Sequence, residues 1–439
     1  MRAAWFVALA GCSSILGIGD LPAPVDPDSG PDGPTCMGNT EACGATCIDL
    51  QTSVDHCGAC DLACPIVSGG ARSCEAGLCR LDVDEAVHAA WTVTAPGPFL
   101  GFWKDGTLLA SNGSSASVLI PPVASPTAQP FTALAGRHTI VIPTNTQKPE
   151  VALSHFGFYE GRKQIDMQAW MNDINGCCGT TPDGFAADPV LGRMFTGHGV
   201  TELDTETGMT AKTTDTQIQH GSSFYVTASA LYLPRRDTAI VTKYDRNHAV
   251  VWSLAMSATA GVTVGEAAIA SDGGIVVGSA MGDKLTRFLP TGVKAWEIDV
   301  VAPGAPITTS TGLVIVGATK GGDPHLCAFD LGMGTERWCT KVDAKVIDAI
   351  AGNDGVIYVS LDGITSVLGL DRATGIVRYT FRNVTPPQEL LLRAGKLYVS
   401  GSGAVTAIDV PATSYDASSW PVRFHDNQRT RGTQATLEF

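Results

Sequence analysis

Apolar residues recur along the chain in short runs that alternate with turn residues. Each run contains three to five alternating or β-branched apolar residues and ends in a glycine- or asparagine-rich turn. Copies occur at residues 106–113, 138–145, 192–199, 230–237, 274–282, 312–321, 355–363 and 395–403. Short runs bounded by turn residues are typical of β-strands, whereas helices need longer segments with a 3.6-residue period. The pattern therefore predicts an all-β protein.

A second marker, a tight turn followed by an aromatic residue, gives the period. Trp252, Trp296, Trp338, Tyr379 and Trp420 are 44, 42, 41 and 41 residues apart. A period near 40 built from short strands is typical of a β-propeller with four-stranded blades. We predict an eight-bladed propeller over residues 95–439, with seven blades as the alternative. The five aromatic residues are expected to dock one blade on the next, and stacking on a ligand is the alternative.

Two of these turn segments resemble a known repeat. AFDLGMGTERW (residues 328–338) and GLDRATGIVRY (residues 369–379) resemble the AxDxxTGxxxW docking motif of the quinoprotein-like (PQQ-like) propeller repeats. The resemblance covers the C-terminal 250 residues well and residues 95–180 poorly. The sequence departs from the motif in three repeats. Phe288 replaces the Asp in one repeat, Lys212 replaces the Trp in another, and the turn before Trp252 is one residue shorter. Residues 418–430 resemble a WPxF-type segment that commonly opens such propellers, so either chain end is a candidate for the strand that completes the ring.

Cysteines are concentrated in one short region. Eight of the 13 lie at Cys36, Cys43, Cys47, Cys57, Cys60, Cys64, Cys74 and Cys79. An even number in a short glycine-rich segment predicts a disulfide framework, in which eight cysteines allow 105 pairings. The single CGAC motif lacks the second CxxC or histidine pair of a zinc site, so no metal is expected. The segment at residues 43–64 resembles the stigma-specific-protein-like modules of myxobacterial exported proteins. That resemblance implies a stalk or binding module at residues 36–80.

Four further cysteines lie in the repeat region. Cys327 and Cys339 flank a predicted hairpin turn at equal distances, which predicts a disulfide between them, with two free thiols as the alternative. Cys177 and Cys178 lie in an unusually long repeat. Quinoprotein alcohol dehydrogenases carry such a vicinal pair beside their cofactor. The pair Cys177–Cys178 is therefore predicted to be either a structural bridge or part of a ligand-binding loop. The nearest candidates for ligand contact are Trp170, Asn172 and Asp173.

The N-terminus is expected to be a targeting signal. Residues 1–11 contain one arginine and a short apolar run, and they lead into Cys12. This arrangement resembles a bacterial lipoprotein signal, which implies lipidation of Cys12 and, because Ser13 follows, an outer-membrane location. An ordinary secretory signal is the alternative. Residues 12–35 are rich in proline, glycine and aspartate, a composition that predicts an extended tether.

Charge and motifs limit the function. The formal net charge of −14 argues against nucleic-acid binding, which requires a basic surface. The sequence contains no nucleophile elbow, phosphate-binding loop or HExxH motif, so no catalytic residue is assigned. We expect a non-catalytic binding or scaffold protein of the cell envelope whose partners are envelope proteins or glycans. The alternatives are a dehydrogenase that uses PQQ and calcium, and a carbohydrate-binding surface protein.

Overall fold

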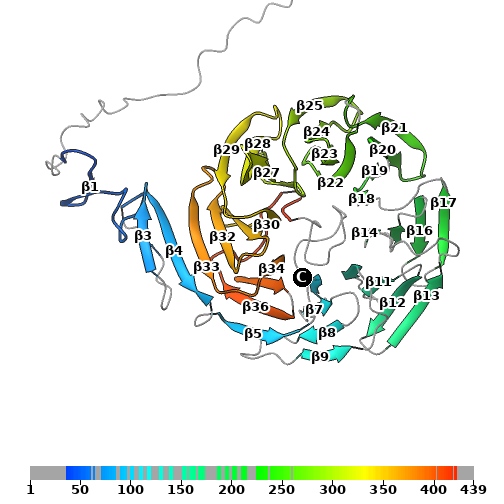
Figure 1. Cartoon of the computed structure of the whole chain (residues 1–439), viewed down its shortest axis with the longest axis horizontal. Coiled ribbons are helices and arrows are strands. Elements are labelled where there is room, and N and C mark those ends of the chain that lie inside the picture. The colour runs from blue at the N-terminus through cyan, green and yellow to red at the C-terminus, as the bar shows by residue number, and fades with distance from the viewer. Residues whose placement is uncertain are drawn as a thin grey trace, which may run out of the picture.

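The computed structural model describes most of the chain from residue 36 to residue 422 (Figure 1). Its description is nearly complete from residue 238 onward, where it omits residues 259, 260, 402 and 419, and between residues 99 and 223 it is mainly confined to the strands. The predictions for residues 1–35, including Cys12, and for Cys177 and Cys178 lie outside the described residues. Within the described part, no helix has the length and hydropathy needed to cross a membrane.

The prediction of an all-β fold with four-stranded sheets is confirmed. Consecutive strands pair antiparallel within each sheet. The sheets are β6 (Phe99–Phe102), β7 (Leu108–Ser111), β8 (Ala116–Leu119) and β9 (Ala128–Phe131); β10 (His138–Val141), β11 (Val151–His155), β12 (Phe158–Gln164) and β13 (Met167–Asp173); β14 (Phe185–Asp188), β15 (Arg193–Thr196), β16 (Val200–Asp204) and β17 (Thr210–Thr214); β18 (Tyr225–Val226), β19 (Ala230–Arg235), β20 (Ile240–Asp245) and β21 (Val250–Ala255).

The remaining sheets follow the same plan. They are β22 (Thr263–Ile269), β23 (Ile275–Met281), β24 (Lys284–Phe288) and β25 (Lys294–Asp299); β26 (Ile307–Thr308), β27 (Leu313–Lys320), β28 (Asp323–Asp330) and β29 (Glu336–Lys341); β30 (Val346–Ala351), β31 (Val356–Leu361), β32 (Ser366–Asp371) and β33 (Val377–Arg382); and β34 (Pro387–Arg393), β35 (Lys396–Gly401) and β36 (Ala404–Asp409). The first strand of each sheet lies nearest a common axis and the fourth lies far from it (Figure 1).

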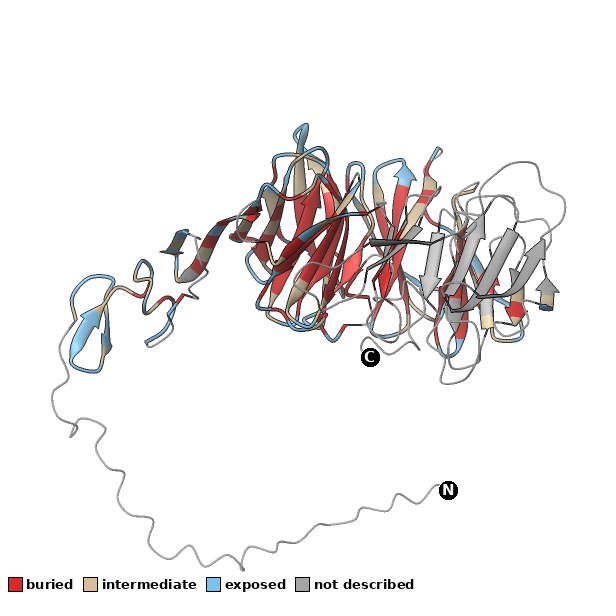
Figure 2. Cartoon of the chain, turned by 90° about the horizontal axis from the view of Figure 1, so that it is seen from below, coloured by how far each residue is buried: buried red, intermediate tan, exposed pale blue. Residues whose placement is uncertain are grey.

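Seven of the eight predicted apolar runs are the second strands of their sheets. The exception is the run at residues 138–145, which contains β10, a first strand. A second strand has neighbouring strands on both sides and neighbouring sheets on both faces, so continuous apolar sequence is needed there. In β31, for example, all six residues are buried. The buried core therefore lies within and between the sheets (Figure 2).

Tryptophan side chains connect successive sheets. The indole Nε1 of Trp252, Trp296 and Trp338 donates to a turn carbonyl of the following sheet, that of Pro290 at 3.1 Å, Leu331 at 2.9 Å and Arg372 at 2.9 Å. Each indole also packs on a turn glycine: a Cβ added at Gly292, Gly334 or Gly375 would lie 2.9, 2.9 or 2.5 Å from the ring. These turns need glycine because they have a positive φ and because the ring leaves no space for a side chain.

One junction between sheets is polar instead. Lys212 of β17 donates to the carbonyl of Asn247 in the next sheet, which is the contact that tryptophan makes elsewhere. His248, with φ 64°, occupies the turn in place of glycine, and its Nε2 lies 3.1 Å from Glu202 Oε2. Glu202 also pairs with Arg193 at 2.9 Å. The hydrogen bond with His248 is the main cause that lowers the pKa of Glu202.

An N-terminal strand completes the last sheet. The short strand β5 (Trp91–Thr94) pairs antiparallel with β36 and forms the outer strand of the sheet β34–β35–β36–β5. The first strand of that sheet, β34, contacts β30 on one side and β6 on the other. The propeller region therefore begins at or before residue 91 rather than at residue 95, and the fourth strand of this sheet comes from the N-terminal side of the chain.

The cysteine-rich region is continuous with the same architecture. The hairpin of β3 (Ala71–Glu75) and β4 (Leu78–Asp84) pairs in parallel with β33 and makes a six-stranded sheet. Leu81 and Val83 of β4 enter a core cluster with residues of β31 to β36, and Asp82 accepts a hydrogen bond from Arg382 at 2.5 Å. The predicted boundary at residue 80 therefore falls inside a strand that belongs to both regions.

Four disulfides hold the cysteine-rich region together. They join Cys36 to Cys47, Cys43 to Cys60, Cys57 to Cys74 and Cys64 to Cys79, with Cα–Cα distances of 5.4, 5.5, 5.7 and 5.3 Å. The last two bonds end on β3 and β4, while β1 (Glu41–Cys43) and β2 (Thr46–Ile48) form a separate hairpin. The sulfurs of Cys57, Cys64 and Cys79 lie close together because they belong to two neighbouring disulfides, and bonded sulfurs are not thiolate ligands for a metal. Farther along the chain, Cys327 and Cys339 are opposite one another in β28 and β29 and are bonded.

Candidate functional site

The antiparallel sheets give the ring two different faces. Turns that join first to second strands and third to fourth strands lie on one face, which we call the clamp face. Turns that join second to third strands, and the links from one sheet to the next, lie on the opposite face, which we call the pocket face. Each face carries one feature that stands out from the repeats.

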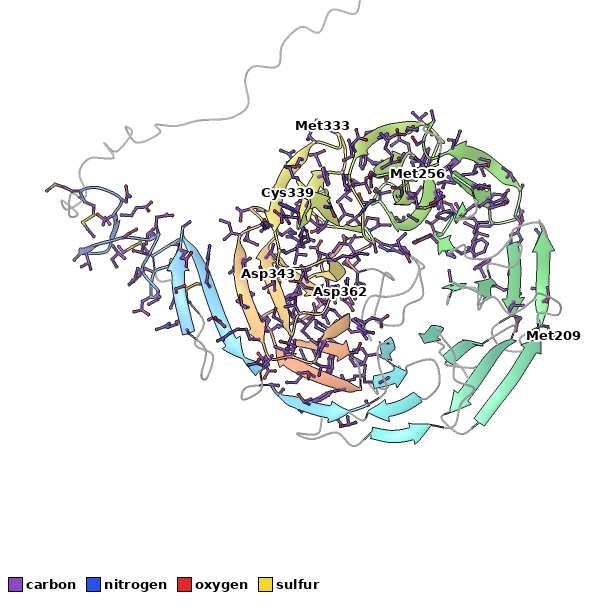
Figure 3. The ribbon with its side chains drawn as sticks, in the orientation of Figure 1. Met209, Met256, Met333, Cys339, Asp343 and Asp362 are labelled. Carbon is purple, nitrogen blue, oxygen red and sulfur yellow. A yellow bond between two sulfur atoms is a disulfide. The ribbon has the colours of Figure 1, made fainter. Side chains whose placement is uncertain are left out.

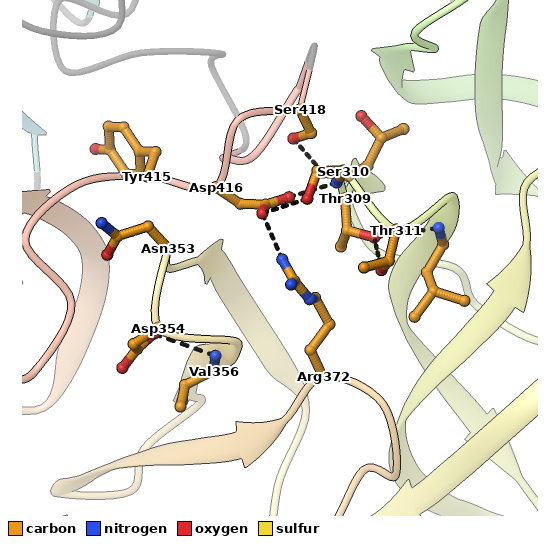
Figure 4. A network of polar contacts seen from close by, with 12 residues as sticks. Thr309, Ser310, Thr311, Asn353, Asp354, Val356, Arg372, Tyr415, Asp416 and Ser418 are labelled. Atoms are coloured by element: carbon orange, nitrogen blue, oxygen red, sulfur yellow. Dashed lines mark hydrogen bonds and ion pairs between the residues drawn. The ribbon is translucent and has the colours of Figure 1, made fainter. Parts of the chain in front are cut away.

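On the clamp face, the segment after β36 is held by a buried carboxylate (Figure 4). Asp416 accepts hydrogen bonds from the backbone N–H and the hydroxyl of Ser310, the latter at 2.6 Å, and it forms an ion pair with Arg372. The Asp416 side chain is 5% exposed and that of Arg372 is 17% exposed. Ser310 lies between β26 and β27, and Arg372 lies between β32 and β33. The carboxylate therefore ties the C-terminal segment to turns of two sheets.

The same segment adds backbone hydrogen bonds along the inner strands. Asp416 N–H donates to the carbonyl of Ala351 in β30, Thr308 N–H of β26 donates to the carbonyl of Trp420, and Ala351 N–H donates to that of Pro421, each at 2.8 Å. The Ser418 hydroxyl donates to the Thr308 carbonyl at 2.7 Å. These bonds satisfy polar groups on the inner edges of β26 and β30, so residues 414–422 behave as an extra element inside the ring.

Trp420 lies in a different place from the other aromatic residues that were predicted to dock the blades. Trp420 is not on an outer strand, because the outer strand of the last sheet is β5. Its side chain is fully buried among residues of β18 to β24, and its ring centroid lies 5.2 Å from that of Tyr225. The 41-residue interval from Tyr379 to Trp420 therefore matches the period of the sequence repeat, but Trp420 does not occupy the equivalent structural position. Tyr379, by contrast, lies buried on β33 opposite Gly369, in the register that Trp296 and Trp338 have in their sheets.

Two groups on the clamp face have raised pKa values for structural reasons. Burial raises the pKa of Asp354, whose carboxylate accepts hydrogen bonds from the Tyr358 hydroxyl at 2.7 Å and from Val356 N–H at 3.1 Å. Burial also raises the pKa of Tyr358, and the neighbouring Asp354 adds to that effect. Both oxygens of Asp354 are used to fix the turn between β30 and β31, so this pair stabilises the turn and leaves no oxygen directed at a ligand.

The pocket face contains a pocket between two neighbouring sheets. It has a volume of about 340 Å³, and its lining includes Ala302, Gly304, Gly317, Thr319, Lys345 and Val346. Gly304 and Ala302 belong to the link before β26, Gly317 and Thr319 to the end of β27, and Lys345 and Val346 to the start of β30. The size falls within the range of small-ligand pockets. Lys345 contributes the charge.

Sequence reasoning missed a set of acidic residues on the inner strands. Glu266 of β22, Asp348 of β30 and Glu389 of β34 lie at or beside irregularities in strand pairing. Asp348 Oδ2 accepts a hydrogen bond from Leu390 N–H of the next sheet at 3.0 Å, and Glu266 accepts one from the hydroxyl of Tyr225 in the preceding sheet at 3.2 Å. Two of these acids therefore connect neighbouring sheets. A sequence signal existed, because Glu266 and Asp348 each precede a turn glycine, Gly273 and Gly355, by seven residues.

The predicted ligand-loop residues lie in a strand. Trp170, Asn172 and Asp173 belong to β13 and pair with Gly161, Tyr159 and Phe158 of β12. β13 is the outer strand of its sheet (Figure 1), whereas the residues of the Asp416 network and of the Lys345 pocket belong to other sheets. A ligand-binding role for these three residues stays a prediction.

Known proteins share this architecture. A family model described as "Outer membrane protein assembly factor BamB" matches residues 237–414. The crystal structure of BamB from Moraxella catarrhalis covers 73% of this chain and 98% of its own, with 14% identity and a TM-score of 0.53. Sqt1 from Saccharomyces cerevisiae has the same coverage with 11% identity and a TM-score of 0.61. The chain has a β-propeller fold, and its residues 237–414 match a PQQ-like repeat model.

The likeness to solved structures is one of fold. A quinohemoprotein alcohol dehydrogenase from Comamonas testosteroni covers 77% of this chain and 79% of its own, with 11% identity and a TM-score of 0.51. Enzymes and non-enzymes therefore share the propeller, and function has to be argued from the sites. Among curated proteins, none matches the sequence significantly.

Proposed function

We propose that this propeller is a non-catalytic binding or scaffold protein of the cell envelope. The match of residues 237–414 to the BamB model carries the proposal, because that model describes an outer-membrane assembly factor. We further propose eight blades completed by β5, a lipid anchor at Cys12 and a tether over residues 12–35. Together these features describe a rigid ring held at the outer membrane, with other envelope proteins or glycans as partners.

The pocket face is the proposed binding surface. Residues 414–422 already occupy the inner edges of β26 and β30 on the clamp face, where Asp416 and Trp420 fix them. A partner that bound at the centre of that face would have to displace buried groups. The pocket face instead presents a pocket and a charged side chain. Docking a partner on the pocket face therefore requires less free energy than displacing the buried groups of the clamp face.

Site-specific photo-cross-linking tests this proposal. A photoreactive residue replaces Asp362 on the pocket face or Ala373 on the clamp face, both of which are exposed positions. In intact envelopes we expect a discrete cross-linked partner from position 362 and none from position 373. Cross-links from position 373 alone, or from neither, would contradict the proposal. In the same cells, Cys12→Ser should release the protein from the membrane fraction.

A quinoprotein dehydrogenase is the second candidate, favoured by the fold shared with the Comamonas enzyme. Calcium requires six to eight oxygen ligands. Where side chains are described, the one cluster with metal-ligand spacing consists of disulfide-bonded cysteines. The described residues thus do not fit the calcium site that PQQ needs, and no step through PQQ is derived. Incubation with PQQ and calcium should leave the absorption spectrum of free PQQ unchanged and give no dye reduction with alcohols. Binding of the protein to glycans on an array would favour the carbohydrate-binding alternative.

A further inference from the structure

Lys345 differs from the other cationic side chains of the protein. Where side chains are described, every other lysine and arginine has an interaction partner: Lys320 pairs with Glu336, for example, and Lys341 with Asp323. The Lys345 ammonium has none among those residues. The chain has 43 acidic and 29 basic residues, so an unpaired cation is not explained by a shortage of carboxylates. Lys345 is an exposed residue at the wall of the pocket, so its ammonium can reach an anion that comes from outside the chain.

The rest of the pocket limits what that anion is attached to. Ala302 and Val346 give an apolar wall, and the Thr319 hydroxyl, which also lacks a partner in the described structure, offers a second polar contact. Gly304 also lines the pocket, and a Cβ added there would lie 3.7 Å from Gly317 N, an ordinary contact distance, so the backbone tolerates alanine at this position. A volume of about 340 Å³ suits a small apolar body with one charged group.

Neighbouring acids distinguish between anions. Asp362 N–H donates to the carbonyl of Lys345 at 2.8 Å, and the exposed carboxylates of Asp343 and Asp362 lie at this end of the sheet β30–β33 (Figure 3). Neither forms an ion pair with Lys345, but both contribute negative potential. Such surroundings repel a doubly charged phosphate more strongly than a singly charged carboxylate. One ammonium and one hydroxyl also match the two oxygens of a carboxylate.

We propose that the pocket beside Lys345 binds a carboxylate carried on a small apolar group, with Lys345 as the cation and Thr319 as a second hydrogen-bond donor. This inference rests on the proposed binding function, because the carboxylate of a partner's chain terminus would anchor that partner on the pocket face. A free organic acid has the same chemistry and would occupy the same pocket.

Ligand-observed NMR with the full chain tests the proposal. The probes are N-acetylvaline as a chain-terminus mimic, its methyl amide as the uncharged control, isobutyrate as a free acid, and inorganic phosphate. We expect N-acetylvaline to bind with a dissociation constant of about 1 mM, which is typical of so small a ligand. The methyl amide and inorganic phosphate should not bind. Stronger binding of N-acetylvaline than of isobutyrate would favour a chain terminus. The reverse order would favour a free acid, and both orders support the carboxylate site.

Matched variants connect the binding to the pocket. Lys345→Gln removes a charge-assisted hydrogen bond and should weaken N-acetylvaline binding about tenfold or more. Gly304→Ala should weaken it by filling the floor, while Lys341→Gln, which removes a paired lysine, should not. Equal binding of the amide, equal binding by Lys345→Gln, or no binding of either acid would overturn the proposal. If the acids bind but position 362 gives no cross-link in envelopes, the pocket assignment stands and the partner-binding function fails.

Discussion

The clearest energetic test of the C-terminal segment is Trp420→Ala. The Trp420 side chain is fully buried against Tyr225 and the strands β18 to β24, and its carbonyl accepts the Thr308 N–H. Replacing a fully buried tryptophan by alanine typically costs about 3–5 kcal/mol, from lost transfer free energy and the cavity left behind. That is a large part of the stability of a typical domain, about 5–15 kcal/mol. The variant should therefore be strongly destabilised.

Urea denaturation measures this loss. We expect the transition midpoint of Trp420→Ala to fall with little change in slope, because the native fold is retained. Trp252→Ala is a useful control, since Trp252 is only partly buried and should cost less. Limited trypsin digestion adds a local readout, because Arg423 follows the segment directly and cleavage there should be faster in the variant. A loss below about 1 kcal/mol, of the size expected for a surface substitution, would refute the packing described for this segment.

Further predictions concern the clamp, a turn and acid stability. A double-mutant cycle of Asp416→Ala and Arg372→Ala should give a favourable coupling of about 1–3 kcal/mol, because the pair is largely buried, and a coupling near zero in urea denaturation would contradict the clamp. Gly375→Ala should destabilise more than Gly363→Ala: both have positive φ, but only at position 375 would the methyl lie against an indole, that of Trp338, and equal thermal midpoints would argue against the docking contact. Glu202→Gln should lose stability at neutral pH and show a flatter decline in acid. The lowered pKa of Glu202 gives stabilisation that is complete above its ordinary value of 4.5 and is lost as pH falls through the folded-state pKa. Acid titration followed by circular dichroism measures this, and parallel declines of the two proteins would count against the Glu202–His248 bond.

Much of the repeat architecture was predictable because burial on two sides requires continuous apolar sequence. The second strands β15, β19, β23, β27, β31 and β35 were recognisable from such runs. The tryptophan–glycine turns were equally readable, since the contact of each indole with the next turn fixes both residues. The run at residues 138–145 was misleading because a first strand that lies between two sheets can also be apolar.

The features set by long-range pairing were not predictable. Trp420 continues the 41-residue interval, yet the outer strand of the last sheet is supplied by β5, more than 300 residues earlier in sequence. Likewise, the parallel pairing of β4 with β33 leaves no local signal, which is why the boundary at residue 80 was misplaced. Lys345 was not singled out, because its significance lies in its place at a pocket and in the absence of a partner among the described residues. Asp416 resembled any exposed acid until the fold placed Arg372 and Ser310 around it.

Methionine footprinting in native envelopes tests the binding claim most directly. Met281 ends β23 on the pocket face and is 62% exposed, whereas Met209 and Met333 belong to turns of the clamp face and are 70% and 64% exposed. Met256 is fully buried and serves as the internal reference (Figure 3). Mass spectrometry after brief oxidation should show Met281 protected in envelopes relative to the purified protein, with Met209 and Met333 oxidised equally in both. Protection of Met209 and Met333 with Met281 still oxidised would contradict the account.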